Sequence, residues 1–116
     1  MHFDIVIKDI NNKIKLMECC QDGNLRIWDF HSGIQINKIK ISNAYITSLC
    51  LWNDNYIFIG TKGKILLFEL KNKIIVKTLI HKDNYIFIKK IIHPKYGECI
   101  ISQNAEESII KMWINN

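Results

Sequence analysis

The sequence has no apolar run long enough to cross a membrane as a helix, because no stretch reaches the roughly 18 apolar residues that such a span needs. Its first residues, Met1 to Asp4, lack the basic start and the apolar run of a secretory signal peptide. We therefore expect a soluble intracellular protein. A cytoplasmic location is the default, and a nuclear location stays open.

Paired-cysteine motifs are also missing. The chain has four cysteines, none of which forms a Cys-x-x-Cys pair of the kind that binds zinc; they are Cys19, Cys20, Cys50 and Cys99. All four lie inside apolar, strand-like patterns, where a free thiol behaves as a small hydrophobic group. We expect buried, reduced thiols, with a disulfide or a metal site as the alternative.

Catalytic motifs are absent as well. No His-x-x-x-His pair, Gly-x-Ser-x-Gly elbow or glycine-rich phosphate loop occurs. The four histidines lie in expected turns or at the terminus: His2, His31, His81 and His93. The sequence therefore predicts a protein that is not an enzyme, with no catalytic, cofactor-binding or metal-ligating residue.

Charge of one sign is in modest excess, and it forms no block. Sixteen basic side chains face eleven acidic ones, which gives a net charge of +5. Such a balance attracts nucleic acid or acidic membrane surfaces, whereas scattered lysines without runs of five or six are typical of a solvated exterior. The hydrophobic content of 48% is enough for a sizeable core.

What the sequence does have is a repeated pattern. The stretch 22–29, Asp-Gly-Asn-Leu-Arg-Ile-Trp-Asp, is a tight turn followed by a short strand that ends in Trp-Asp. Phe68-Glu69 places an aromatic residue and an acid 40 residues after Trp28, and Trp113 follows 45 residues after Phe68. A period of about 40–45 residues, with several strands in each unit, is typical of propeller blades.

The turn signals divide the chain into three units, which span residues 1–41, 42–80 and 81–116. Alternating apolar residues between turns predict antiparallel strands. They are expected from Phe3 onward and at 14–20, 25–30, 34–41, 45–51, 56–61, 64–70, 74–80, 85–92, 98–102 and 109–114. The apolar phase slips at Asn37-Lys38, which suggests a bulge. The third unit lacks a fourth strand.

The chain resembles the WD-repeat β-propeller family over essentially its whole length. The resemblance rests on Trp28-Asp29 and the turn before it, on Trp113, and on the variant pair Phe68-Glu69. His81 stands where the family has the His of its Gly-His pair, and residues 92–98 resemble the hydrophobic-x-Pro-x-x-Gly turn. It implies an all-β fold of antiparallel four-stranded blades.

The family often has a buried hydrogen-bond relay of Trp, Ser or Thr, His and Asp in each blade. The resemblance makes Asp22 and Trp28 relay candidates in the first unit, with Cys20 at the hydroxyl position. In the third unit the candidates are His81 and Trp113. In the second unit Lys62 replaces the Asp and Phe68 the Trp, so the relay is lost there. Trp28 and Trp113 are expected to pack between blades.

The number of units departs from the family pattern. Propellers close with roughly 4–8 blades, and this chain has two full units and most of a third. We therefore expect an incomplete propeller that is a fragment of a longer one. The alternatives are that copies self-associate through open blade edges, or that the ends stay open.

The resemblance implies a non-enzymatic scaffold that binds other proteins. Family members bind partners on the face built from the turns between the second and third strands and between successive blades. The partner-binding candidates are the residues that match this face and one tryptophan at an expected turn. They are Asn24, Asn43, Trp52, Lys62, Lys64 and Lys82. Trp52 ends a strand at a turn, so it is either an interface anchor or a cover for a neighbouring blade.

Two other functions stay open. Lys62, Lys64 and Lys82 would form a basic patch for RNA, DNA or anionic lipid headgroups, although the Phe-Arg-Arg-Gly motif of phosphoinositide-binding propellers is absent and Arg26 is the sole arginine. A substrate receptor of a ubiquitin ligase often has Arg two residues after Trp-Asp. Here His31 occupies that position, which weakens that interpretation.

Overall fold

The computed structural model describes residues 3–8, 12–80, 86–104 and 110–114, and in these ranges it consists of strands and turns without a helix. The strands are β1 (Phe3–Lys8), β2 (Ile14–Cys19), β3 (Asn24–Asp29), β4 (Gln35–Lys40), β5 (Ile46–Leu51), β6 (Tyr56–Thr61), β7 (Lys64–Glu69), β8 (Ile74–Ile80), β9 (Ile86–His93), β10 (Gly97–Asn104) and β11 (Ile110–Ile114). All neighbours pair antiparallel.

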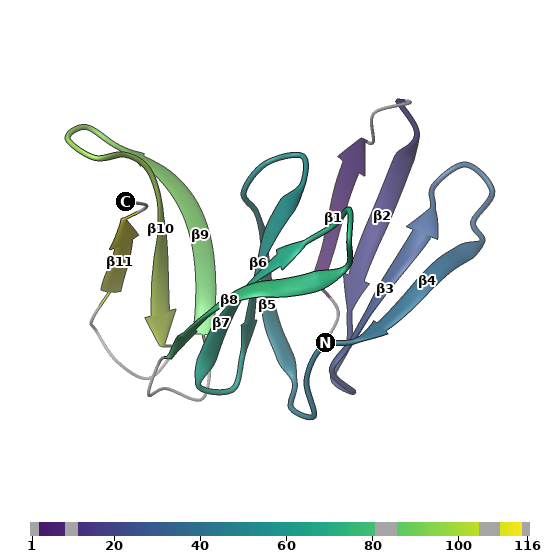
Figure 1. Ribbon diagram of the computed structural model, residues 1–116, viewed down its shortest axis with the longest axis horizontal. Coiled ribbons are helices and arrows are strands. Elements are labelled where there is room, and N and C mark those ends of the chain that lie inside the picture. Colours follow the sequence, from purple (N-terminus) through teal and green to yellow (C-terminus); the bar gives the residue numbers. More distant parts are fainter. Residues whose placement is uncertain (1–2, 9–11, 81–85, 105–109, 115–116) are drawn as a thin grey trace.

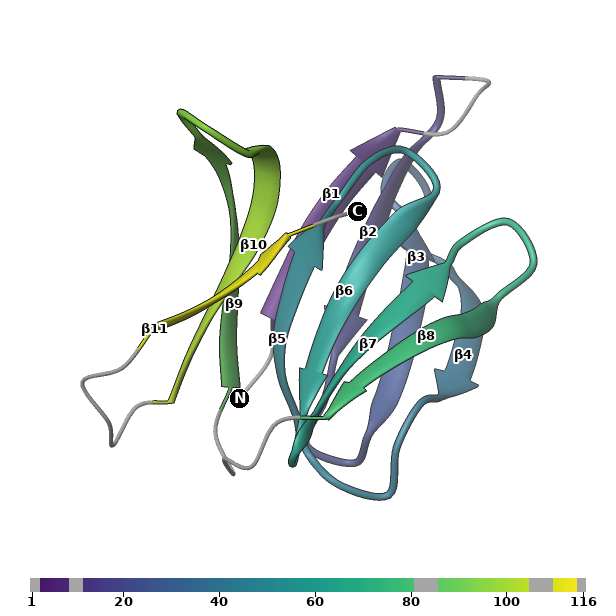
Figure 2. The same cartoon turned by 60° about the vertical axis from the view of Figure 1, so that its left-hand side comes forward.

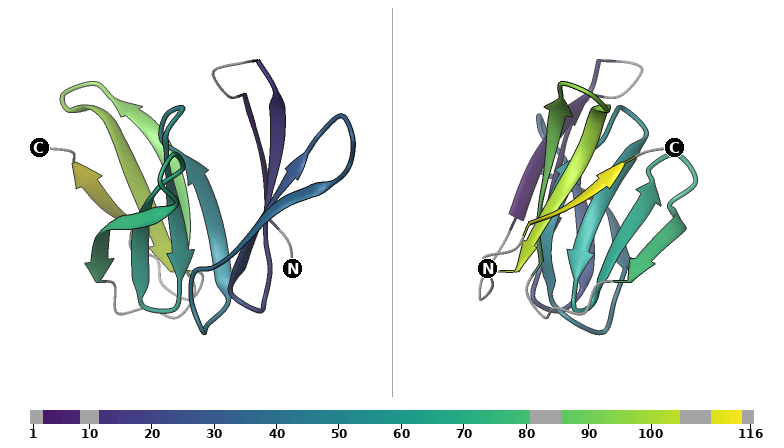
Figure 3. Two further views of the ribbon diagram at one scale, coloured as in Figure 1. Left: turned by 45° about the vertical axis from the view of Figure 1, so that its right-hand side comes forward. Right: turned by 90° about the vertical axis from the view of Figure 1, so that its left-hand side faces the viewer.

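The strands form three meandering sheets that stand side by side (Figure 1). The first sheet is β1-β2-β3-β4, the second is β5-β6-β7-β8, and the third is β9-β10-β11. Strand β5 contacts both β1 and β9, so the opening strands of the three sheets lie next to one another. Figures 2 and 3 show the second sheet between the other two.

The outer strand of each four-stranded sheet has a β-bulge. In the first sheet Ile27 pairs with Asn37 and Trp28 with Gln35, which leaves Ile36 as the extra residue. The bulge predicted at Asn37-Lys38 therefore lies one residue earlier. In the second sheet Val76 is the extra residue, because Leu67 pairs with Lys77 and Phe68 with Ile75. A bulge strengthens the local twist of an outer strand.

In the third sheet, β10 is longer than the sequence predicted, because it spans residues 97–104 and not 98–102. Residues Gln103 and Asn104, which were expected in a turn, pair with Phe87 and Ile86 of β9. His93, also expected in a turn, pairs with Gly97 at the other end of the same ladder. The pairing extends because β9 provides eight residues of continuous backbone donors and acceptors, which outweigh the polar character of Gln103 and Asn104.

The larger core lies between the first and second sheets. Its buried residues are Met17, Cys19, Leu25 and Ile27 from the first sheet and Ile46, Ile57, Ile59, Leu66 and Phe68 from the second. On β3 the buried residues Leu25 and Ile27 alternate with half-buried ones, as expected for a strand that buries one face. This core joins the two sheets into one packed unit.

A smaller core joins the second and third sheets. It contains four buried residues, Cys50, Ile65, Ile88 and Ile100, with Trp52, Phe58, Leu79 and Trp113 packed against it. The second sheet is therefore covered on both faces, which explains why its strands are the most apolar of the chain. All four cysteines are buried, as their apolar surroundings predicted.

A buried hydrogen bond crosses between the second and third sheets. The backbone N–H of Ile88 donates to Ser48 Oγ at 3.1 Å, and both residues are buried. We expect Ser48→Ala to lower the free energy of unfolding by about 1–3 kcal/mol, because the Ile88 N–H then has no acceptor at that position. Urea unfolding followed by circular dichroism measures the loss.

The matched control is Ser32→Ala, which removes an exposed hydroxyl that donates to Asp29 at 2.6 Å. Water replaces that bond, so we expect a change within about 0.5 kcal/mol. Equal losses in the two variants would contradict a stabilising role for the buried bond.

Candidate functional site

The turns at one end of the first and second sheets carry several polar residues, and we call this end the turn face. It consists of the β2–β3 turn, the segment 41–45 and the β6–β7 turn, at the lower end of these sheets in Figure 1. Four of the predicted partner-binding residues lie here: Asn24, Asn43, Lys62 and Lys64. All are exposed except Asn24, which is half-buried.

The β2–β3 turn is fixed to the connection between the two sheets. Gly23 has φ +80°, and its carbonyl accepts hydrogen bonds from the N–H of Ile41 at 2.9 Å and of Ser42 at 3.2 Å. A Cβ at Gly23 would lie 1.8 Å from the Ser42 carbonyl oxygen. Glycine is therefore required here twice, for the positive φ and for the close approach of two backbones.

The second sheet is fixed to the same connection through a buried hydroxyl. Thr61 Oγ1 donates to the Tyr45 carbonyl at 2.7 Å and lies 3.2 Å from Ser42 Oγ. Thr61 itself is 2% exposed. The β2–β3 turn of the first sheet and Thr61 of the second sheet are thus both attached to the segment 41–45.

Asp22 holds the turn from within. Its carboxylate accepts a hydrogen bond from the Asn24 N–H at 3.0 Å, and it pairs with the Arg26 guanidinium at 3.1 Å. The hydrogen bonds from Asn24, followed by the charge of Arg26, lower the pKa of Asp22 to about 2. Asp22 is therefore ionised at neutral pH, and its carboxylate is engaged by Asn24 and Arg26 of the same hairpin.

This lowered pKa makes a prediction about acid stability. The folded-state pKa of Asp22 lies below its ordinary value of 3.8, so ionised Asp22 stabilises the fold above that value. The contribution disappears as the pH falls from about 4 to about 2. We expect Asp22→Asn to lack this part of the acid-side decline in urea midpoint. Parallel pH profiles for the wild type and the variant would contradict the assignment.

The relay candidates do not form one network within the described residues. Trp113 Nε1 donates to Ser102 Oγ at 2.9 Å, and Ser102 is buried. Trp28 alternates with Leu25 and Ile27, so it lies on the face of the first sheet that is turned away from the second sheet. His81 lies outside the described residues.

The strand register changes the assignment of the hydroxyl position in the first sheet. Trp113 pairs with Ile100, two residues before Ser102. Trp28 pairs with Leu16, so the residue equivalent to Ser102 is Glu18 and not Cys20. The Cys20 thiol instead accepts a hydrogen bond from Arg26. The sequence interpretation missed this because a spacing count cannot fix which residues face each other across a hairpin.

Trp52 lies at the end of the second sheet that is farthest from the turn face. Ile46 pairs with Thr61 at the turn face, and Trp52 follows the pair Leu51–Ile57 at the far end. Its ring packs edge-on against Phe58, with centroids 5.5 Å apart. The Lys90 ammonium, from the third sheet, lies 4.9 Å from the Trp52 ring and donates to its carbonyl at 2.7 Å. Trp52 thus contacts the neighbouring sheet. Lys82 lies outside the described residues.

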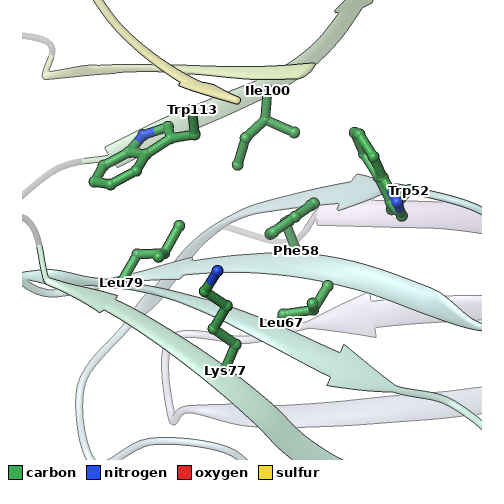
Figure 4. A pocket seen from close by; sticks show the side chains of 7 residues that line it. All are labelled: Trp52, Phe58, Leu67, Lys77, Leu79, Ile100 and Trp113. Carbon is green, nitrogen blue, oxygen red and sulfur yellow. The ribbon is translucent and has the colours of Figure 1, made fainter. Parts of the chain in front are cut away.

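A pocket of about 170 Å³ lies between the second and third sheets, and we call it the inter-sheet pocket. It is lined by Trp52, Phe58, Leu67, Lys77, Leu79, Ile100 and Trp113. Figure 4 shows Trp113 and Ile100 of the third sheet on one side, with Phe58, Leu67 and Lys77 of the second sheet on the other. No sequence pattern predicted this pocket, because residues of five strands and a turn contribute to its wall.

In the part of the chain that the structure describes, no three His, Cys, Asp or Glu side chains gather closely enough to hold a metal ion. No helix in the same ranges is long and apolar enough to span a membrane.

Comparison with known proteins establishes the class of fold. No protein-family model matches the sequence, and no curated protein matches it. Solved structures that match include the β-propeller domain of Cps50 (Swd1) from Myceliophteria thermophila, with a TM-score of 0.62 and 15% sequence identity. The match covers 98% of this chain and 41% of that chain, so this chain spans less than half of the propeller that it resembles. The chain has the all-β fold of an incomplete β-propeller, as the repeat pattern predicted.

Proposed function

We propose that this chain is a non-enzymatic scaffold of the WD-repeat type that binds other proteins through its turn face. The observation that carries the proposal is the attachment of the β2–β3 turn and of Thr61 to the same connecting segment. Side chains from two sheets are thereby presented at fixed spacing. Binding residues commonly lie on loops that a rigid scaffold positions.

The chemistry of the turn face suits a polar protein surface. Asn43 offers an amide that both donates and accepts hydrogen bonds, and Lys62 and Lys64 add two exposed positive charges. Asp22 is already paired with Arg26, so it offsets little of the charge on the two lysines. We therefore expect partners whose contacting surface is acidic or polar.

The test is partner capture with a charge-reversed turn face. The variant Lys62→Glu with Lys64→Glu reverses two exposed charges on the turn face. The control, Lys71→Glu with Lys73→Glu, makes the same change in the exposed β7–β8 turn at the other end of the second sheet. Quantitative mass spectrometry of proteins bound to each tagged variant is the measurement.

We expect the turn-face variant to bind the wild-type partners at least tenfold more weakly, which is about 1.4 kcal/mol of binding free energy. The control should bind them as the wild type does. Partners that are lost equally from both variants would assign binding to net charge alone. Partners that are retained by both would exclude the turn face as the binding surface.

The same lysines also favour a second candidate, the binding of RNA, DNA or anionic lipid headgroups. Lys62 and Lys64 are exposed neighbours at one end of a rigid sheet. Binding of this kind weakens steeply as salt rises, because each neutralised phosphate releases counterions. Fluorescence anisotropy with a single-stranded RNA oligonucleotide between about 50 and 200 mM salt measures that slope. A flat response would exclude electrostatic binding of RNA.

A further inference from the structure

The inter-sheet pocket exists because the second and third sheets pack less completely than the first and second. Phe68 is 1% exposed in the larger core, whereas Trp113, its counterpart in the third sheet, is only half-buried. Phe58 and Leu67, which project toward the third sheet, are also half-buried. Several large apolar side chains therefore share a space that none of them fills.

Of the described residues that line the pocket, one is charged, and its charge is positive. Lys77 belongs to β8, and the end of its side chain points into the space between Leu79, Phe58 and Trp113 (Figure 4). Among the described residues that line the pocket, none has an acidic side chain. Within the described ranges Lys77 has no ion-pair partner, whereas Lys90 nearby is already paired with Glu98 at 3.4 Å. An anionic group that entered the pocket would find one available cation.

The volume of the pocket limits what it can hold. An apolar protein cavity of about 150 Å³ is large enough to bind benzene, so about 170 Å³ fits one aromatic ring and little more. Sites for free metabolites add several placed polar groups that fix orientation. Here the Trp113 N–H is already bonded to Ser102, and the Trp52 carbonyl to Lys90. A side chain of a protein partner needs no such groups, because the rest of its interface orients it.

We propose that the inter-sheet pocket receives one aromatic side chain of a protein partner, with the carboxylate of an adjacent Asp or Glu paired to Lys77. This inference rests on the proposed protein-binding function and names the chemistry that the partner must carry. The ring lies among Trp52, Phe58 and Trp113, and the acid stays at the mouth, where Lys77 is exposed. Aromatic anchors in pockets commonly dominate the energy of protein interfaces.

The first test uses capped dipeptides and the full chain labelled with nitrogen-15. The chain has three tryptophans, each of which gives one indole N–H signal by nuclear magnetic resonance. Acetyl-Phe-Glu-amide should shift the Trp52 and Trp113 signals saturably at millimolar concentration. The Trp28 signal, from the other face of the first sheet, is the internal reference and should stay in place.

Two control peptides separate the ring from the charge. Acetyl-Ala-Glu-amide should give no saturable shift, because it has no ring to fill the pocket. Acetyl-Phe-Gln-amide should bind about two- to five-fold more weakly than the Glu peptide, as expected for an exposed ion pair. Equal shifts with all three peptides, or shifts at Trp28 of the same size, would overturn the proposal.

Two variants test the lining directly. Lys77→Gln should remove the preference for Glu over Gln, whereas Lys71→Gln, a charge-matched change outside the pocket, should retain it. Leu79→Phe places extra volume in the pocket and should abolish the shifts at Trp113. A folded Leu79→Phe protein that binds the Phe-Glu peptide like the wild type would exclude this pocket. If this variant does not fold, the peptide series on the wild type still decides.

Partner capture distinguishes failure of this inference from failure of the proposed function. If captured partners depend on Lys62 and Lys64 but bind Lys77→Gln and Leu79→Phe unchanged, the scaffold function stands and the pocket assignment fails. If the Phe-Glu peptide binds with the expected selectivity but no partner depends on the turn face, the pocket chemistry stands and the turn-face proposal fails.

Discussion

Gly23→Ala should lower the free energy of unfolding by about 3–5 kcal/mol, one of the largest losses that a single substitution in this chain can cause. A non-glycine residue at φ +80° costs about 1–2 kcal/mol by itself. The new Cβ would also lie 1.8 Å from the Ser42 carbonyl oxygen, which is backbone and cannot rotate away. The turn must then move, which breaks the two hydrogen bonds that the Gly23 carbonyl accepts.

Gly33→Ala is the matched control for this prediction. Gly33 also has a positive φ, +70°, but a Cβ there would meet nothing within 4 Å. It should therefore lose only the conformational part, about 1–2 kcal/mol. Urea unfolding of the two variants measures the difference. A loss at Gly23 no larger than that at Gly33 would show that the β2–β3 turn is not held against segment 41–45.

Phe68→Ala should cost about 3–5 kcal/mol, the usual range for removing a fully buried aromatic side chain. Phe68 is 1% exposed and lies in the core between the first and second sheets. Trp28→Ala should cost only about 1 kcal/mol, although Trp28 is the larger residue and occupies the equivalent strand position. It lies half-buried on the face turned away from the second sheet.

Thermal and urea unfolding of Phe68→Ala and Trp28→Ala, each compared with the wild type, measure this contrast. The sequence motif by itself predicts the opposite order of losses, because Trp28-Asp29 matches the motif and Phe68-Glu69 is a variant of it. A larger loss for Trp28→Ala than for Phe68→Ala would mean that, in solution, the core lies on the face of the first sheet that is turned away from the second sheet.

The strand pattern could be predicted because its causes are local. Alternation of apolar residues fixes which side chains share a face, and turns such as Asp22-Gly23 end one strand and start the next. The bulge in β4 left a visible slip in that alternation. The bulge at Val76 left none, because Ile74, Ile75 and Val76 are all apolar and the phase of the pattern is hidden there.

The candidate site could be predicted only in part. The resemblance to the WD-repeat family predicts one shared face for Asn24, Asn43, Lys62 and Lys64, and these residues do lie at one end of the first two sheets. Trp52 was predicted to be an interface anchor or a cover for a neighbouring blade, and it lies at the opposite end of the sheet, where it contacts the third sheet. The inter-sheet pocket was not foreseen, because Lys77 and Trp113 are far apart in sequence and no local pattern couples them.

The sequence by itself determined that the chain is all-β, that its units repeat, and that Gly23 and Gly63 turn the backbone. These properties follow from dihedral preferences and from a two-residue apolar period, which act over a few residues. Only the tertiary structure decided which aromatic residue is buried and where space remains. Phe68 is covered because another sheet stacks on its face, and Trp113 lines a pocket because smaller side chains meet it from the second sheet. Burial depends on neighbours that are distant in sequence, and the local sequence pattern does not identify those neighbours.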